Sequence, residues 1–266
     1  MKKKVFICSN QTETSKKTAY ELQSKLQAAD FLVMNEFNDN TDLLISIGGD
    51  GATLKAIHEY DFPEVPIIGV NTGRLGFFQE IHPEQLDEFI DNYINNKYRL
   101  QPLSTVKATV HTKDKTFVRH GLNEIVITGG RPTTVHLNIS IDNTFIEKFS
   151  GDGIVISTPA GSTAYNYSLG GAIVDPRIKL LQITPVAPMN TTAYRSFTSS
   201  LLLPPDLPID ITPENDRSNK ISIISDGVDY DYYDVDEIKI EFAQKIVNLL
   251  RFESYEFWAK VKSKFL

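Results

Sequence analysis

The chain has 266 residues, of which 41% are hydrophobic and 23% charged, and it carries a formal net charge of −7 at pH 7. That length predicts a sizeable core in one large domain or two, and the acidic balance argues against a general nucleic-acid binder. Cys8 is the one cysteine, which excludes an internal disulfide and is consistent with a cytoplasmic protein. No stretch approaches the roughly 20 apolar residues of a membrane span, so no membrane association is expected.

The first hundred residues alternate short apolar runs with amphipathic stretches. The runs at 5–8, 43–47 and 66–70 predict strands, and 14–29, the stretch after residue 51 and the stretch from Pro83 predict helices. The last of these helices is expected to face inward with Leu86, Phe89, Ile90 and Tyr93. This alternation predicts a parallel sheet covered by helices, with ligands beyond the carboxyl ends of its strands.

The second predicted strand runs directly into a glycine turn, Gly48-Gly49-Asp50-Gly51. Glycines at such a turn can adopt positive φ and let a phosphate approach the N–H groups at the start of the following helix. Asp50 is unexpected there because a carboxylate repels a phosphate, which suggests chemistry beside the phosphate. The alternative is a tight strand-to-helix connection in which Asp50 is only the N-cap.

After about residue 100 the pattern changes to short strands, which predicts a β-rich second domain. The strands are expected near 106–112, 135–141, 145–146, 154–156, 180–183, 201–203, 209–211 and 221–224. Asp142-Asn143 is expected to form a turn, 203–208 a loop or edge segment, and 228–237 a solvated turn and edge strand. In the tail, Trp258, Val261 and Phe265 recur at helical spacing, so this segment is expected to pack back on a core.

Segment 157–171 is dense in glycine, hydroxyl, amide and phenol groups. Such a mixture suits a bound sugar or base with many donors and acceptors, although a Ser/Thr/Gly loop is the simpler interpretation. Asn123-Glu124 places an amide beside a carboxylate between two strand patterns, and taken alone it is typical of a turn.

Taken in order, four motifs resemble the NAD kinase family: Gly48-Gly49-Asp50-Gly51, segment 71–77, Asn123-Glu124, and Gly151-Asp152-Gly153 leading into 157–171. The resemblance implies ATP-dependent phosphorylation of the 2′-hydroxyl of the adenosine ribose of NAD, which gives NADP. It also implies an α/β N-terminal domain with a parallel sheet, an all-β, β-sandwich-like C-terminal domain, and a C-terminal segment that returns to the first. We expect the boundaries at 1–100, 101–240 and 241–266.

The same resemblance assigns the site. Asp50 would be the general base, Asn123 and Glu124 would bind the dinucleotide, and Asp152 would lie on its nicotinamide-ribose side. A neighbouring subunit would complete the site in a homo-oligomer, commonly a tetramer, and Mg²⁺ would accompany the ATP. The ligand-binding residues implied are Gly48, Gly49, Gly51, Phe77, Asn123, Glu124, Lys148, Ser150, Asp152, Ser157, Thr163, Ala164, Tyr165, Asn166, Tyr167, Ser168, Ala187 and Tyr194.

Three positions depart from the family pattern. The Asp226-Gly227 pair resembles another element of the family but is followed by Val228, where the family usually has a polar residue. Ala52 stands where the family usually has threonine, with Thr53 one place later, and Ser150 stands where many relatives have arginine, with Lys148 two places before it. These departures bear on the affinity for the phosphoryl donor, which could be ATP, another nucleotide or polyphosphate.

Other chemistry finds less support in the sequence. The five histidines show no paired metal spacing, so no metal site made by the chain itself is expected. There is also no phosphate-binding Gly-x-x-x-x-Gly-Lys motif and no Gly-x-Gly-x-x-Gly fingerprint. Two alternatives stay open: a lipid or diacylglycerol-type kinase that shares the glycine turn, and a non-catalytic NAD-binding regulator. An intact Asp50 favours an enzyme over the regulator.

Overall fold

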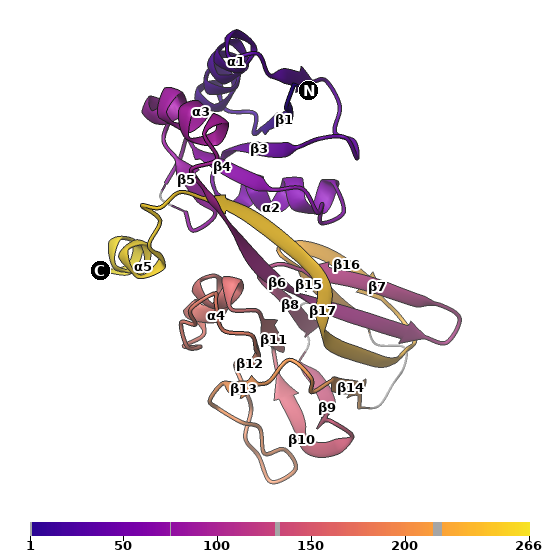
Figure 1. The fold of residues 1–266 in the computed structure, drawn as a ribbon. Coiled ribbons are helices and arrows are strands. Elements are labelled where there is room, and N and C mark those ends of the chain that lie inside the picture. Colours follow the sequence, from indigo (N-terminus) through magenta and orange to yellow (C-terminus); the bar gives the residue numbers. More distant parts are fainter. Residues whose placement is uncertain (1, 75, 131–133, 215–219) are drawn as a thin grey trace. The chain divides into compact units, whose positions relative to one another are not determined.

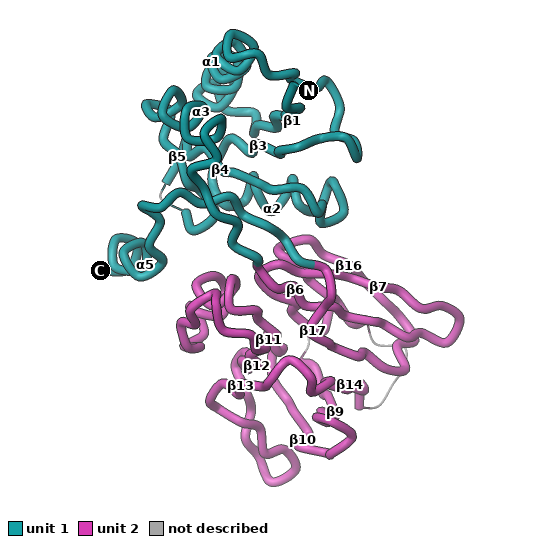
Figure 2. Tube along the Cα trace, viewed as in Figure 1, with its two compact units in different colours: residues 1–102, 246–266 teal, residues 103–245 magenta. Residues whose placement is uncertain are grey.

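The polypeptide folds into two compact units, and the chain passes from one to the other twice. The computed structural model describes residues 2–74, 76–130, 134–214 and 220–266. Unit 1 comprises Met1–Pro102 and Ile246–Leu266, and unit 2 comprises Leu103–Lys245 (Figure 2). Strands β6 (Arg99–Thr112) and β17 (Val235–Arg251) each have residues in both units.

Unit 1 is an α/β structure with a parallel sheet in the order β17-β4-β3-β1-β2, and β5 also pairs with β4. Helices α1 and α3 lie on one face of the sheet and α2 lies on the other (Figure 1). The remaining elements of this unit are β1 (Lys4–Ser9), α1 (Glu13–Ala28), β2 (Leu32–Met34), β3 (Leu43–Gly48), α2 (Asp50–Glu59), β4 (Ile67–Asn71), β5 (Gln79–Ile81), the short 3₁₀ helix η1 (Pro83–Gln85), α3 (Leu86–Ile94) and α5 (Phe257–Phe265).

The core of unit 1 follows from the apolar periodicity of its sequence. Leu22 of α1 and Phe89 of α3 are fully buried against β-branched residues such as Ile45 of β3. All four positions predicted to face inward on α3 are buried, which confirms the expected stripe. Burial of such a side chain stabilises the fold by roughly 1.5–3 kcal/mol.

Unit 2 consists of two sheets with antiparallel neighbours. One contains β10-β9-β14-β17 together with β6 and β7, and the other has the order β13-β12-β11-β8-β15-β16. Leu137 and Ile238 of the first sheet join Ile125 and Ile156 of the second in one buried cluster, so the all-β, sandwich-like prediction is confirmed. The elements not yet bounded are β7 (Thr116–Gly121), β8 (Glu124–Gly129), β9 (Val135–Ile141), β10 (Thr144–Gly151), β11 (Gly153–Ser157), the 3₁₀ helix η2 (Ala160–Thr163), α4 (Tyr165–Ser168), β12 (Leu181–Val186), β13 (Leu201–Leu203), β14 (Ile209–Pro213), β15 (Ile221–Ser225) and β16 (Val228–Tyr232).

The predicted turn at Asp142-Asn143 is confirmed. Its two residues have φ of +48° and +60°, the conformation of a two-residue hairpin, and they join β9 to β10. Asp and Asn tolerate this left-handed backbone better than other residues with a side chain, which explains why this pair occupies the turn.

The C-terminal segment returns to unit 1 as expected, but only part of the predicted stripe faces inward. Trp258 is 52% exposed, so its assignment to an inward stripe is wrong. Phe265 faces inward as predicted, with its ring centroid 6.0 Å from that of Phe77. Phe257, which was not predicted, takes the place of Trp258, with its ring centroid 5.8 Å from that of Phe77.

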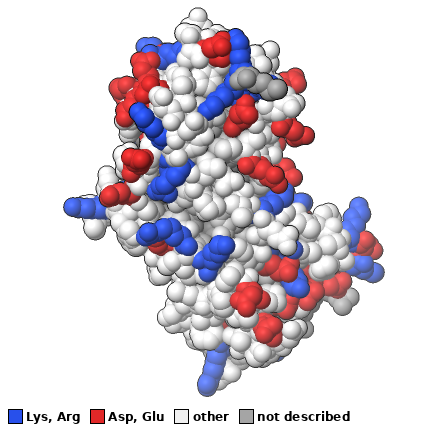
Figure 3. All heavy atoms as spheres, viewed as in Figure 1, with Lys and Arg blue, Asp and Glu red and all other residues white. Residues whose placement is uncertain are grey.

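The surface carries both signs of charge. On the face shown in Figure 3, acidic and basic side chains are interspersed. Among the helices that the structure describes, none combines the length and the apolar character needed to cross a membrane.

Candidate functional site

The glycine turn joins β3 to α2, and its first glycine is required sterically. Gly48 has φ of +154°, and a Cβ on it would come within 2.5 Å of the Ala52 Cβ. Gly49 is the helix N-cap with φ of −102°, and Gly51 lies in the first turn of α2. The expectation of positive φ therefore holds for Gly48 only, and Asp50 is the first helical residue, not the N-cap.

Asp50 is held by the loop that follows β4. Its Oδ2 accepts the backbone N–H of Phe77 and its Oδ1 accepts that of Phe78, each at 2.9 Å. The Lys264 ammonium of α5 lies 3.7 Å from Oδ2. A Cβ on Gly76 would overlap the carboxylate, so a residue larger than glycine there would displace the carboxylate or the loop. Of the motif 71–77, Leu75 lies outside the described residues.

Thr53, which stands one place after the position where the family usually has threonine, has a hydroxyl with partners inside unit 1. It is fully buried. Its hydroxyl donates to Ser46 Oγ at 3.2 Å and accepts from the Gln79 side chain at 2.9 Å. The hydroxyl therefore ties α2 to β3 and β5.

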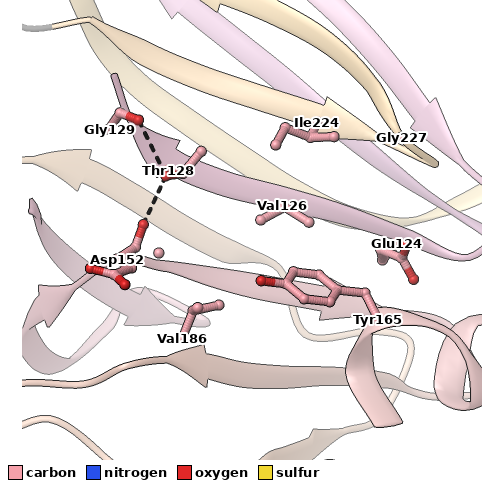
Figure 4. Close-up of a pocket in the computed structure, with 10 residues that line it drawn as sticks. Glu124, Val126, Thr128, Gly129, Asp152, Tyr165, Val186, Ile224 and Gly227 are labelled. Carbon is pink, nitrogen blue, oxygen red and sulfur yellow. Dashed lines mark hydrogen bonds between the residues drawn. The ribbon is translucent and has the colours of Figure 1, made fainter. Parts of the chain in front are cut away.

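A second group of predicted residues surrounds a cavity of about 590 Å³ in unit 2. Volumes of 300–1,000 Å³ are typical of sites for small molecules and cofactors. The Tyr165 side chain extends along the cavity from α4, with Glu124 near one end and Asp152 near the other (Figure 4). Described residues that line it are Glu124, Val126, Thr128, Gly129, Asp152, Gly153, Tyr165, Val186, Ile224 and Gly227.

Asn123 and Glu124 supply buried polar atoms without a partner. Asn123 Oδ1 and Glu124 Oε2 have no hydrogen-bond partner within the described part of the chain. The pKa of Glu124 is raised to about 8, mainly because the side chain is buried and also because of the negative charge of Asp226. Because buried polar atoms are normally hydrogen-bonded, the unpartnered oxygen of Glu124, a residue that lines the cavity, marks a place where a ligand can bind.

The segment after β11 packs against these two residues. Thr158 donates its backbone N–H to Asn123 O at 2.9 Å, and a Cβ on Gly161 would overlap the Asn123 backbone. Two stretches that the sequence singled out separately, 123–124 and 157–171, are therefore neighbours in unit 2.

Within this segment the predicted ligand residues differ in exposure. Tyr165, Tyr167 and Ser168 are exposed, whereas Ser157 and Asn166 are fully buried. The Asn166 Nδ2 donates to Ser162 O and Ala172 O, and its Oδ1 accepts from Thr184 at 2.6 Å. Ser157 donates to Thr158 O at 2.9 Å. Thr163 is buried and Ala164 half-buried in the adjoining turn.

Of the remaining predicted residues, Lys148 and Tyr194 share Glu214 as a partner. Lys148 pairs with Glu214 at 2.6 Å, and the Tyr194 ring stacks on His136 with centroids 4.9 Å apart. Ser150 is buried, and Ala187 is exposed with φ of +45°. Of the described residues that line the cavity, none is Lys148, Ser150, Ala187 or Tyr194.

Asp226 was only partly anticipated. The sequence marks it beside Gly227, but gives no sign of what it contacts. Its carboxylate accepts the backbone N–H groups of Leu122, Asn123 and Glu124 at 2.7, 2.7 and 3.1 Å. It therefore fixes the backbone of Glu124, which lines the cavity, and of the two residues before it.

The fold of the described chain is that of the NAD and NADH kinases. It resembles the crystal structure of yeast NADH kinase complexed with NADH, with a TM-score of 0.86, 22% identity, and coverage of 99% of this chain and 87% of that one. It also resembles an NAD kinase from Archaeoglobus fulgidus in complex with ATP, with a TM-score of 0.74, 23% identity and 99% coverage of both chains.

Comparison of the sequence with known families and proteins identifies the family. Residues 4–98 match the ATP-NAD kinase N-terminal domain and residues 122–252 match the ATP-NAD kinase C-terminal domain. The NAD kinase of Finegoldia magna is 37% identical over 98% of this chain and 97% of the relative. NAD kinase 1 of Listeria monocytogenes is 36% identical over 87% and 88%. The chain belongs to the ATP-NAD kinase family.

Proposed function

We propose that the chain transfers a phosphoryl group from ATP or another donor to the 2′-hydroxyl of the adenosine ribose of NAD, and so makes NADP. The observation that carries the proposal is the carboxylate of Asp50, fixed by two backbone N–H groups at the glycine turn of a chain in this family. A lipid kinase or a passive NAD sensor would share the turn, but the family match extends over both units.

Asp50 is proposed as the general base. In the transfer, the ribose 2′-oxygen forms a bond to the donor's terminal phosphorus, the bond from that phosphorus to the leaving group breaks, and Asp50 takes the hydroxyl proton. Each carboxylate oxygen accepts one N–H and keeps a lone pair for the incoming hydroxyl. The two N–H bonds hold the carboxylate in one orientation, which reduces the cost of aligning it.

The phosphoryl donor is proposed to approach the start of α2. This helix has 10 residues, and the N–H groups of its first turn favour an anion. Gly48 shapes the turn. Gly49 and Gly51 leave open space where a side chain would otherwise stand, because no atom in the described part of the chain lies within 4 Å of a Cβ built on either. Phe77 supplies an N–H to the base itself.

Mg²⁺ is proposed to arrive on the phosphates of the donor. Among the described residues, no group of three or more His, Cys, Asp or Glu side chains could hold a metal ion. We therefore assign Mg²⁺ to the donor substrate, because this ion is commonly bound through one or two carboxylates and the substrate's phosphates.

NAD is proposed to bind in the cavity of unit 2. The unpartnered Asn123 Oδ1 and Glu124 Oε2 are acceptors that suit ribose hydroxyls, and the exposed ring of Tyr165 offers a stacking surface. Asp152 is proposed for the nicotinamide-ribose side, with Thr163, Ala164, Tyr167 and Ser168 along the adenosine and nicotinamide pockets. Ser157 and Asn166 act through the shape of the segment, since their polar groups have partners inside unit 2.

The division of roles follows the expected boundaries. Residues 1–100 are proposed to carry the donor and the base, 101–240 to bind NAD, and 241–266 to complete the first domain. We also propose a cytoplasmic homo-oligomer, a tetramer, in which Ala187 and Tyr194 contribute to the site of a neighbouring subunit. The exposed Met189 and Phe197 of the same segment support an interface there. Sedimentation or light scattering of the full chain checks this, and a monomer would contradict it.

A coupled assay tests the function. The purified chain is incubated with Mg²⁺, NAD and in turn ATP, other nucleoside triphosphates or polyphosphate, and NADP is detected with an NADP-specific dehydrogenase. NADP formation with at least one donor supports the proposal. Phosphorylation of a diacylglycerol in place of NAD would support the lipid kinase, and NAD binding without product from any donor would support the regulator.

A further inference from the structure

Arg251, at the end of β17, is a buried cation whose role the proposed chemistry does not yet include. Its side chain is 2% exposed and forms an ion pair of 3.0 Å with Glu80, itself 3% exposed. The guanidinium carbon lies 3.8 Å from the centroid of the Tyr255 ring, and Nε donates to Gln101 at 2.8 Å. All of these residues belong to unit 1.

The remaining donors of Arg251 reach the loop that holds Asp50. Nη2 donates to the backbone carbonyl of Phe77 at 2.7 Å and Nη1 to that of Phe78 at 3.4 Å. The N–H groups of the same two residues point to Asp50 at 2.9 Å each. The loop is thus bound by a cation on its carbonyl side and by the carboxylate on its N–H side.

One peptide group joins these two charges. The carbonyl of Phe77 and the N–H of Phe78 belong to the same planar amide, so Arg251 bonds one end of it and Asp50 the other. Hydrogen bonds in series through a polarisable group strengthen one another in a poorly solvated interior. The cation therefore orients this amide and makes it a better donor to the carboxylate.

We propose that Arg251 is a positioning residue for Asp50: it fixes the Phe77–Phe78 loop so that both N–H groups hold the carboxylate in the orientation that accepts the substrate proton. The inference rests on the proposed function of Asp50 as the base. Only a planar fork with several donors can bond two carbonyls, Glu80 and Gln101 together. A buried ion pair is weak evidence for stability alone, because an apolar replacement is often tolerated.

The test compares Arg251→Met and Arg251→Lys with Arg99→Met. Arg99 is the matched control because it is exposed and its guanidinium lies 5.9 Å from the centroid of the same Tyr255 ring. We expect kcat of Arg251→Met to fall about 10- to 100-fold, with KM for NAD and for the donor within about twofold of wild type. Arg251→Lys should recover part of the loss, since it keeps the charge but not the fork, and Arg99→Met should retain wild-type kcat.

A second readout does not need catalysis. Amide hydrogen exchange at Phe77 and Phe78 should quicken about 10-fold in Arg251→Met and Arg251→Lys, and stay unchanged in Arg99→Met. If wild type makes no NADP, the proposed function fails while exchange still reports on the loop. If Arg251→Met does not fold, the kcat and the amide exchange of Arg251→Lys test the positioning role. A folded Arg251 variant with wild-type kcat, or with unchanged exchange at both amides, overturns the positioning role.

Discussion

The carboxylate of Asp226 accepts a hydrogen bond of 3.1 Å from the backbone N–H of Glu124, and its charge adds to burial in raising the pKa of the Glu124 side chain to about 8. Asp226 thus fixes the backbone of Glu124 and disfavours ionisation of the Glu124 carboxyl. At neutral pH the Glu124 carboxyl is mostly protonated in the free protein and can donate as well as accept.

This raised pKa predicts a pH-dependent stability. Between the ordinary pKa of 4.5 and about 8, folded Glu124 keeps a proton that the unfolded chain has lost. The free energy of unfolding therefore falls as the pH rises through that window. Glu124→Gln removes the effect, so its stability relative to wild type should increase steadily from about pH 4.5 to about pH 8 in urea unfolding experiments. The exposed Glu84→Gln is the control, and a pH-independent difference for Glu124→Gln would contradict the assignment.

Replacement of the base should separate turnover from binding. Asp50→Asn keeps the size of the side chain but cannot take the hydroxyl proton. We expect kcat to fall about 10²–10⁴-fold while the Kd for NAD, measured by calorimetry, changes little. An Asp50→Asn enzyme with wild-type turnover would exclude Asp50 as the base.

Gly76 offers a steric test of the same carboxylate. A Cβ at this position would overlap Asp50, so Gly76→Ala must displace either the carboxylate or the loop. We expect kcat to fall at least 10-fold, because a misplacement of about 1 Å can cost about 10²-fold. Gly73→Ala is the matched control, since no atom of the described residues lies within 4 Å of a Cβ built there. Equal activity of the two alanine variants would mean that the position of the Asp50 carboxylate does not matter.

Asn166 is expected to act through stability. In Asn166→Asp, an oxygen would replace the Nδ2 that donates to the carbonyls of Ser162 and Ala172 at 3.1 and 3.2 Å. Repulsion between oxygens and the loss of both bonds should lower the free energy of unfolding by about 2–4 kcal/mol. The control is Asn143→Asp, at an exposed turn position whose backbone both Asn and Asp tolerate. It should change the free energy of unfolding by less than about 0.5 kcal/mol. Full stability of Asn166→Asp, measured by chemical denaturation, would argue that Asn166 faces a ligand.

The sequence predicted well those features that depend on neighbours along the chain. Apolar periodicity located the strand before Gly48 and the inward face of α3, and the Asp142-Asn143 pair located a hairpin, because each is decided within a few residues. The short edge strand β2 gave no comparable signal, since its Leu32 is 45% exposed and it has only three residues.

Contacts between distant residues were not predictable in the same way. Asp226 bonds the Asn123 backbone from 103 positions away, and Arg251 bonds Phe77 from 174 positions away. Neither residue type nor spacing reveals such a partner, because both side chains are equally compatible with a solvated surface. The same holds for Trp258, where helical spacing alone did not determine which face of α5 turns inward.

The insertion of unit 2 within unit 1 has a consequence for biosynthesis. A ribosome that has made the first 102 residues has not yet made Ile246–Leu266, which belong to the same unit. Unit 1 can therefore be completed only after roughly 140 further residues have been synthesised, because Arg251 and α5 follow them in the chain. Unit 2 is contiguous in the chain, and domains generally fold as units. The part of the protein that emerges first is the part that is finished last.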